Sequence, residues 1–326
     1  MFDFFNFGGK NTRKIKKKNK KKKKNTNDNN NTNNTNNNKK FKTLKCAPKQ
    51  KLLVSNELQN YSCYSNDQLF SFKTIWNKMN SNKITTNNPK EIWNFFKNNL
   101  SKECYNELCW LDNSSLKSKL NKDELAKSIF RPFSPKEWNK KPYAWLSSVD
   151  IIKVMKQYNR SYKKFKFIGP SPIDFDSKEL EGSCVSEELC NFDLKKYYYN
   201  NPKKTKIGII FNLDKHNMPG SHWVALFVDI KNKFIFYFDS NGTKVPKEIK
   251  ILIERIVEQG KQLNIEFKLY NNENIEHQKK DGQCGVYSLY FIIQLLRENK
   301  TPQFFLTNRV TDELMKDYRN IYFNKK

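Results

Sequence analysis

The segment 286–296 limits the possible folds more than any other part of the chain, because its apolar side chains recur at helical spacing on every side. A helix that is apolar around its whole circumference is buried in a folded protein. The segment contains Ser288 and Gln294 and is much shorter than the roughly 20 residues that a membrane-spanning helix needs. We therefore expect a buried helix in a soluble protein that has no membrane segment.

Segments with the composition of strands precede this helix. Four runs are rich in Ile, Val, Phe and Tyr: 206–211, 222–230, 233–239 and 264–270. A helix is predicted over 246–259, between the last two runs, because apolar residues repeat at helical spacing and Gly260 follows. Another helix is predicted over 145–158. This alternation predicts an α+β domain over residues 142–326.

Two regions of different composition precede that domain. Residues 1–50 hold 16 basic and 2 acidic side chains, which is half of the chain's net charge of +28. This Lys- and Asn-rich stretch has few apolar side chains, so we expect a disordered tail that either binds nucleic acid or is simply solvated. Residues 51–141 carry helical patterns such as Leu69, Phe72 and Trp76, and they predict a separate helical arm without chemistry of its own.

The seven cysteines are an odd set without a CxxC pair, and the N-terminus does not resemble a signal peptide. We therefore expect an intracellular, reducing compartment. The pairs Cys104/Cys109 and Cys184/Cys190 have spacings that suit zinc poorly, and no histidine lies near them. Neither a metal nor an organic cofactor is expected.

Only three histidines are available for chemistry, and one of them, His222, opens a predicted strand. If the turn between this strand and the next falls at 231–232, antiparallel pairing puts His222 opposite Asn241. Asp239 then lies on the same face, one diagonal step away. An imidazole and an orienting carboxylate or amide are therefore predicted to meet at the open end of one hairpin.

Cys284 lies just before the buried helix, where the helix dipole and a neighbouring imidazolium would favour the thiolate. Gly285 keeps the backbone beside the sulfur open. The side-chain amide of Gln278 could join the Cys284 backbone N–H in stabilising an oxyanion. A lone cysteine in this position is more often a buried apolar residue, so the interpretation depends on the combination with His222.

The order His222-Trp223, Asp239, Gln278, Cys284-Gly285 resembles the papain-like cysteine proteases that remove ubiquitin-like modifiers, together with the adenovirus proteinase. The Trp-Leu pair at 145–146 is similar to the segment that opens their catalytic domain. Within this group, the stretch 211–223 most resembles the processing proteases of African swine fever virus and other large DNA viruses. The resemblance extends over residues 142–300 and implies a papain-like core with a central mixed sheet and a buried helix that carries the nucleophile.

The resemblance also implies a role for each residue of the site. Cys284 would supply the thiolate, His222 would act as general base and then as acid, and Gln278 would belong to the oxyanion hole. The residue that orients His222 stays open between Asp239, which the deconjugating enzymes favour, and Asn241, which the large-virus branch favours.

Two tryptophans, Trp145 and Trp223, would by the same resemblance wall a narrow groove that admits small residues, as in Gly-Gly. The function implied is a cysteine endopeptidase that cleaves viral structural precursor proteins in the virion or the host cytoplasm, with possible nucleic-acid contact through residues 1–50. Three alternatives stay open: removal of a ubiquitin-like modifier, acyl transfer through the same Cys and His, and a non-enzymatic basic packaging protein.

Overall fold

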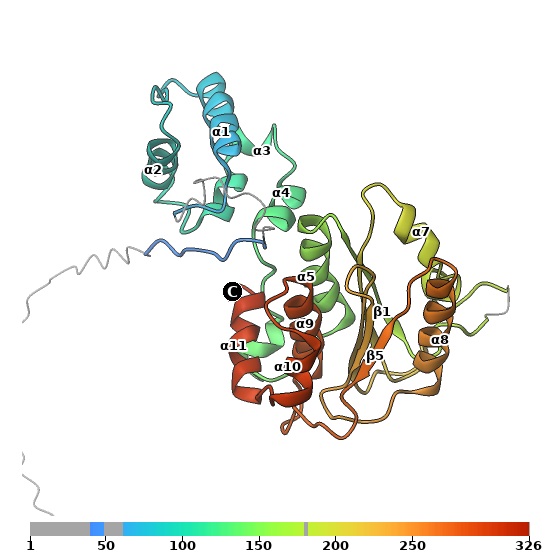
Figure 1. Ribbon diagram of the computed structural model, residues 1–326. Helices are drawn as coiled ribbons and strands as arrows, with labels where there is room; N and C mark the ends of the chain where they lie inside the picture. The colour runs from blue at the N-terminus through green and yellow to red at the C-terminus, as the bar shows by residue number, and fades with distance from the viewer. Residues whose placement is uncertain (1–39, 49–60, 179–181, 326) are drawn as a thin grey trace, which may run out of the picture. The chain divides into compact units, whose positions relative to one another are not determined.

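The computed structural model describes residues 40–48, 61–178 and 182–325 (Figure 1). Most of the predicted tail, namely 1–39 and 49–50, lies outside the described residues. Residues 40–48 are described, and they differ from a solvated tail because Leu44 is buried and Cys46 is disulfide-bonded to Cys63. Residues 40–48 therefore belong to the folded part of the chain, although the tail was predicted to extend to residue 50.

The region that follows is helical, as the sequence predicts. Its elements are α1 (Asn66–Met79), α2 (Pro89–Asn99), the 3-10 helix η1 (Glu107–Asp112), α3 (Ser114–Lys117) and α4 (Lys122–Ile129). Trp76, Trp93 and Trp110 belong to one hydrophobic core within this region. The buried carboxylate of Glu107 accepts hydrogen bonds from Trp93 Nε1, at 2.7 Å, and from the Ser62 hydroxyl. These tryptophans therefore pack in a core.

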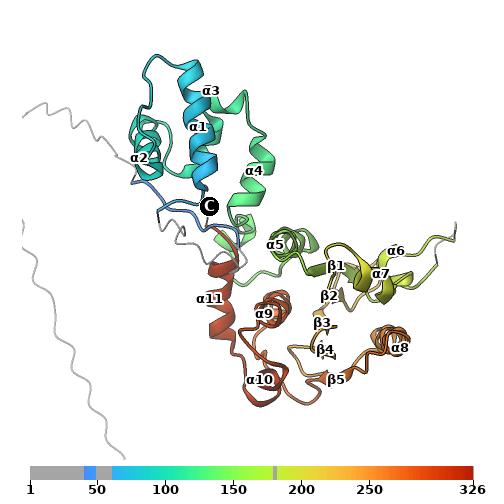
Figure 2. The ribbon, with the colours of Figure 1, turned by 45° about the horizontal axis from the view of Figure 1, so that its top comes forward.

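A five-stranded mixed sheet forms the centre of the rest of the chain (Figure 2). Its strands, in spatial order, are β1 (Phe165–Pro172), β2 (Lys206–Asn212), β3 (Trp223–Asp229), β4 (Phe234–Phe238) and β5 (Lys268–Asn271). The outer pairs β1/β2 and β4/β5 are parallel, whereas β2/β3 and β3/β4 are antiparallel. The α+β class and the mixed sheet are therefore confirmed.

The β3–β4 hairpin has the register that the sequence predicts. Ala225 pairs with Phe238 and Asp229 pairs with Phe234, as they must when the turn falls at 231–232. Lys233 closes the turn in the left-handed conformation, with φ of 53°. The predicted register is therefore correct over the paired part of the hairpin, which ends at Ala225 and Phe238, before the predicted pair of His222 and Asn241.

Two strand predictions differ from the structure. The sequence pattern does not predict β1, because Pro170 and Pro172 interrupt it as they would a loop. β5 begins later than the predicted start at Asn264, whose φ of 57° places it in the turn after α8 (Lys247–Lys261). The helix α8 itself was predicted within two residues at each end.

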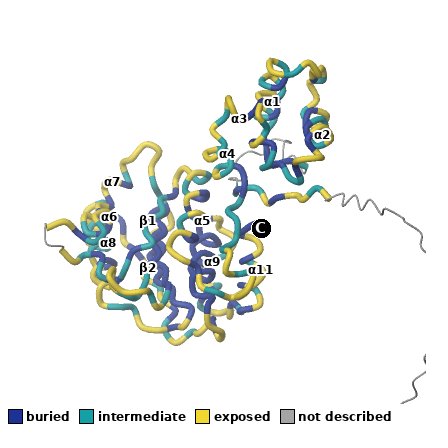
Figure 3. Tube along the Cα trace, turned by 180° about the vertical axis from the view of Figure 1, so that it is seen from behind, coloured by how far each residue is buried: buried dark blue, intermediate teal, exposed yellow. Residues whose placement is uncertain are grey.

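Helices cover both faces of the sheet (Figure 2). Successive side chains of β3 point alternately into two hydrophobic cores, one on each face, so both faces have to be covered. The elements α5 (Ser148–Ser161), α9 (Cys284–Leu296), α10 (Pro302–Thr307) and α11 (Asp312–Tyr322) pack on one face, and α6 (Glu187–Cys190), α7 (Leu194–Tyr199) and α8 pack on the other. Every residue of α9 is buried, as predicted, and Figure 3 shows this helix in the buried centre. Among the described helices, none combines the length and hydrophobicity needed to cross a bilayer.

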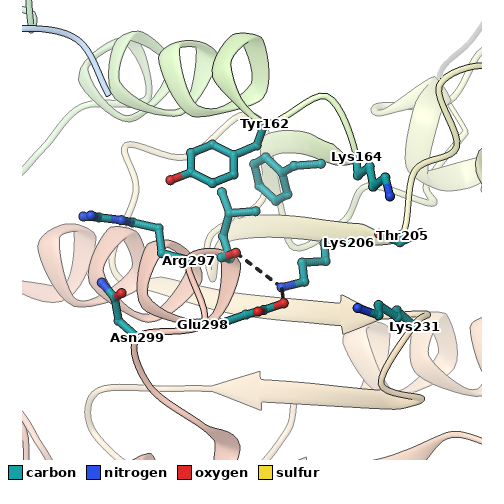
Figure 4. A pocket seen from close by; sticks show the side chains of 10 residues that line it. Tyr162, Lys164, Thr205, Lys206, Lys231, Arg297, Glu298 and Asn299 are labelled. Carbon is teal, nitrogen blue, oxygen red and sulfur yellow. Dashed lines mark hydrogen bonds and ion pairs between the residues drawn. The ribbon is translucent and has the colours of Figure 1, made fainter. Parts of the chain in front are cut away.

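A buried lysine caps the C-terminal end of α9. Lys206 Nζ donates to the carbonyl oxygens of Leu295 at 3.5 Å and Leu296 at 3.3 Å, and it lies 2.7 Å from Glu298 Oε1 (Figure 4). Asp229 Oδ2 lies 3.8 Å from the same nitrogen. Because unpaired carbonyls at a helix end need donors, this lysine joins β2 to the end of α9.

Six of the seven cysteines are paired in the structure. The disulfides are Cys46–Cys63, Cys104–Cys109 and Cys184–Cys190. This corrects the expectation of reduced thiols, since the backbone brings these pairs within bonding distance although no sequence motif marks them. Cys284 is the one free cysteine, and all seven lie within the described residues.

Candidate active site

The open end of the β3–β4 hairpin carries a histidine and a carboxylate in direct contact. His222 immediately precedes β3, Asp239 immediately follows β4, and His222 Nε2 lies 2.6 Å from Asp239 Oδ1. Asp239 is fully buried, whereas the His222 side chain is 14% exposed. Of the two predicted orienting residues, Asp239 therefore contacts the ring. Asn241 is exposed and donates its backbone N–H to Asp239 Oδ1 at 2.9 Å.

Thr243 and Asn272 hold Asp239 in place. The Thr243 hydroxyl donates to Asp239 Oδ2, whereas Asn272 bonds to the backbone: its Oδ1 accepts from the Asp239 N–H at 2.9 Å, and its Nδ2 donates to the Asp239 carbonyl oxygen at 2.6 Å. Burial opposes ionisation, but the hydrogen bond and charge of His222 outweigh it, and with Thr243 they lower the pKa of Asp239. The carboxylate is therefore charged at neutral pH. The sequence predicts neither Thr243 nor Asn272.

Cys284 is the first residue of α9, and its thiol lies close enough to the His222 ring to raise the pKa of that ring. Because Nε2 faces Asp239, Nδ1 is the ring nitrogen left for the sulfur. Burial disfavours the charged ring, but the hydrogen bonds to Asp239 and Cys284 outweigh it and raise the pKa of His222 to about 9. The ring is therefore an imidazolium at neutral pH, and like the helix N-terminus it places positive charge beside the sulfur.

Gln278 approaches the site from the loop that leads to α9. Its backbone N–H donates to the Ser240 carbonyl at 2.9 Å, and its side-chain Oε1 accepts from the Ser240 hydroxyl at 2.9 Å. Because the amide oxygen is engaged, the Nε2 group is the part of this side chain left to donate to another acceptor. Ser240, which directly follows Asp239, therefore joins the two halves of the site.

Both predicted groove residues line one cavity of about 540 Å³, together with Leu146 and Gly220. The indole of Trp223 donates from Nε1 to the Leu146 carbonyl at 2.9 Å, whereas Trp145 is 45% exposed at the surface. A Cβ added to Gly285 would lie 3.2 Å from Trp223 Cδ1 and 3.1 Å from Leu146 Cβ. Two residues that line the cavity, Leu146 and Trp223, therefore pack against the first turn of α9, and the glycine after Cys284 permits this close approach, although no residue of α9 itself lines the cavity.

The other two histidines have different partners. His216 is exposed, and its Nδ1 lies 2.7 Å from Asp174 Oδ2. His277 is fully buried, accepts a hydrogen bond from the Val310 N–H at 3.0 Å, and has its pKa lowered to about 4 by burial. Of the three histidines, His222 is therefore the one in contact with the free thiol.

The family of the chain follows from its C-terminal part. Residues 149–326 match the model of the Ulp1 protease family, C-terminal catalytic domain, and this span is more than half of the chain. The chain belongs to the Ulp1 protease family. It is a cysteine protease, and the resemblance expected from the order of His222, Asp239, Gln278 and Cys284 is confirmed at the level of the family.

Relatives of this Ulp1-family protease occur in large DNA viruses. A thiol protease of Acanthamoeba polyphaga mimivirus is 30% identical over 291 residues, which are 81% of this chain and 90% of the relative. A cysteine protease of African swine fever virus is 28% identical over 250 residues, which are 72% and 88% of the two chains. A crystal structure of the African swine fever virus protease matches with a TM-score of 0.61 at 24% identity, over 86% of this chain and 96% of that one. That structure has the same fold.

Two further side chains of this Ulp1-family protease border the nucleophile, and the sequence analysis does not identify them. Gln283 precedes Cys284 and donates from Nε2 to the Asp312 carbonyl at 3.0 Å. Arg319, in α11, donates from Nε to Gln283 Oε1 at 3.2 Å. These contacts join positions far apart in the chain. No clear sequence signal marks Arg319, because the buried face of α11 carries Asp312 as well as Met315 and Tyr322.

Proposed function

We propose that this Ulp1-family protease is an endopeptidase in which Cys284 is the nucleophile, His222 the general base and acid, and Asp239 the orienting carboxylate. One observation carries the proposal. The buried Asp239 contacts the His222 ring, and the Cys284 thiol at the start of α9 raises the pKa of the same ring. An imidazole that is oriented by one group and bonded to a thiol by its other nitrogen is the arrangement that activates a cysteine nucleophile.

The reaction begins when the Cys284 thiolate attacks the carbonyl carbon of the scissile peptide bond. The negative charge moves to the carbonyl oxygen, where the Cys284 backbone N–H and the Gln278 side-chain amide donate hydrogen bonds, each worth about 3 to 4 kcal/mol. The His222 imidazolium gives its Nδ1 proton to the leaving amine, and the C–N bond breaks to leave a thioester. A water then gives a proton to His222 and attacks the thioester, which releases the acid and restores the thiolate.

The substrate we propose is a protein precursor with small residues before the scissile bond, as in Gly-Gly. Trp145 and Trp223 line one cavity, Trp223 also packs against the glycine after Cys284, and Cys284 is only 2% exposed. A bulky side chain beside the scissile bond would contact the indoles before its carbonyl reached the sulfur. Because relatives of the chain are proteases of large DNA viruses, we place its substrates among viral structural precursors and its action in the virion or the host cytoplasm.

A second candidate function is the removal of a ubiquitin-like modifier. The observation in its favour is the name SUMO-1 cysteine protease, which several African swine fever virus relatives carry at 27% identity. Both functions use the same nucleophile and base, and they differ in the surface that binds the substrate. To separate them, the purified protein is incubated with a capsid precursor and with a modifier conjugate. Cleavage of the conjugate alone would reverse the order of the two candidates.

The catalytic roles are tested by covalent labelling. The protein is treated with a Gly-Gly peptide that ends in a vinyl sulfone, and the adduct is mapped by mass spectrometry. We expect one adduct, at Cys284, that is absent in Cys284→Ser. In His222→Ala the labelling rate should fall by about a hundredfold or more, because the activating base is lost. Labelling that is equally fast in His222→Ala and the wild type would remove His222 from the mechanism.

A further inference from the structure

One charged side chain is buried next to the proposed nucleophile without a catalytic role assigned to it. Arg319, in the last helix α11, is 3% exposed. Its Nη1 donates to the carbonyl oxygens of Ala144 at 2.8 Å and Pro142 at 3.3 Å, and its Nη2 donates to Tyr143 O at 3.4 Å and to Gly282 O. The guanidinium therefore binds two segments of backbone at once.

These two segments are the wall of the cavity and the turn before the nucleophile. Residues 142–144 lead directly into Trp145, which lines the cavity, and Gly282 lies two residues before Cys284. The segments touch, since a Cβ added to Gly282 would lie 2.1 Å from the Tyr143 carbonyl oxygen. Gly282 also has a φ of 85°, a conformation that favours glycine. The turn at Gly282 therefore packs closely against residues 142–144, and Arg319 is the side chain that donates hydrogen bonds to both segments.

The acceptors of Arg319 are neutral, which sets it apart from an ordinary buried ion pair. They are backbone carbonyls and the side-chain amide of Gln283, and the Trp138 ring centre lies 4.5 Å from the guanidinium carbon. In the described part of the chain, no carboxylate forms an ion pair with it. A buried charge without a counter-charge is costly, so its retention here calls for an explanation.

The sulfur of Cys284 supplies a negative charge when it ionises. Burial lowers the pKa of Arg319 to about 10, and the opposing attractions of Cys284 and Tyr143 raise it. Arg319 is thus protonated at neutral pH. Because Arg319 donates to Gly282 and Gln283, the two residues before Cys284, its positive charge is held beside the sulfur, and opposite charges attract strongly where water is excluded.

We propose that Arg319 is a positioning residue of the active site, which holds the Pro142–Trp145 wall against the turn before Cys284 and favours the thiolate by its charge. This inference rests on the proposed role of Cys284 as nucleophile. Arg319 would act in two ways, by hydrogen bonding to the backbone and by its positive charge. The hydrogen bonds need the five-donor shape of a guanidinium, whereas the electrostatic part needs only a positive charge. Two substitutions therefore separate them.

The experiment compares Arg319→Gln and Arg319→Lys with the wild type in two assays. The pH dependence of Cys284 alkylation by iodoacetamide measures how readily the thiolate forms. The values of kcat and KM on a fluorogenic Gly-Gly peptide measure whether the Pro142–Trp145 wall is held in its place beside the substrate. Arg319→Gln loses the charge, so its alkylation midpoint should move to higher pH and its rate at pH 7 should fall by about threefold to tenfold. Arg319→Lys should keep the midpoint but lose about tenfold in kcat/KM, because one ammonium cannot replace the fork of donors.

Met315→Ala is the matched control, because Met315 is a fully buried residue of the same helix and carries no charge. An alkylation shift in Met315→Ala as large as that in Arg319→Gln would overturn the inference, since loosened packing would then suffice. Wild-type kcat/KM in Arg319→Lys would also overturn it, and this outcome can be read even if Arg319→Gln does not fold. If wild-type Cys284 is not alkylated at all, the proposed nucleophile fails instead.

Discussion

The contact between His222 and Asp239 sets the pH range in which the site holds a charged pair. The ring gains a proton below a pKa of about 9. Because the imidazolium must give a proton to the leaving amine, kcat/KM should fall as the pH rises through about 9. A value of kcat/KM that kept rising above this pH would contradict the proposed role of His222 as the general acid.

Replacing Asp239 with Asn tests whether the carboxylate of Asp239 is what raises the pKa of His222. The amide cannot stabilise the imidazolium by charge, while burial still disfavours it, so the pKa of His222 falls. We expect the alkaline limb of the kcat/KM profile to move to lower pH by about one to two units, the equivalent of one charge-assisted hydrogen bond. Asn241→Ala distinguishes the alternative, since a shift in that variant and none in Asp239→Asn would make Asn241 the orienting residue.

The amide of Gln278 acts, in our proposal, only after the thiolate has attacked. Gln278→Ala should therefore lower kcat by about a hundredfold to a thousandfold, the loss of one oxyanion donor. The alkylation rate of Cys284 should stay near the wild-type value, because alkylation by iodoacetamide creates no oxyanion. Steady-state kinetics and alkylation on the same preparation check this. Equal losses in both assays would instead mean that the substitution disturbs the nucleophile.

At the scale of the elements, the sequence predicts what local patterns determine. The buried helix α9 and the β3–β4 register followed from apolar periodicity and one turn position, and this register was enough to bring His222 and Asp239 together. β1 could not be predicted, because its prolines are tolerated only through its pairing at the edge of the sheet. Arg319 could not be predicted either, because its acceptors lie in segments distant from α11 in the chain.

The helix that carries the nucleophile is also held at its other end, by Lys206. In Lys206→Met the terminal carbonyls of α9 lose a donor and the buried Asp229 loses its counter-charge. We expect a loss of about 3 kcal/mol in the free energy of unfolding, measured by urea denaturation. Lys250→Met, which removes an exposed ion pair with Glu254, should have no measurable effect. Equal effects of the two substitutions would show that the cap contributes nothing.

At the scale of the whole molecule, the charge is unevenly distributed along the sequence. Residues 1–39 contain twelve basic and two acidic side chains, and the described chain starts directly after them. Since Cys46 is bonded to Cys63 and Leu44 is buried, a truncation that starts at residue 40 keeps these contacts of the helical region. The contribution of the basic segment can therefore be measured apart from that of the protease domain.

If residues 1–39 bind nucleic acid, binding should be strongly salt-dependent, because each lysine that neutralises a phosphate releases a counterion. With about six such contacts, the affinity of the full chain for duplex DNA should fall by about a thousandfold between roughly 50 and 200 mM salt. The chain without residues 1–39 should bind more weakly and with a shallower slope, while its kcat/KM on a Gly-Gly peptide stays the same. Fluorescence anisotropy at several salt concentrations measures both slopes. Identical slopes would assign the binding to the rest of the chain, and a flat response in both would exclude phosphate contacts by the basic segment.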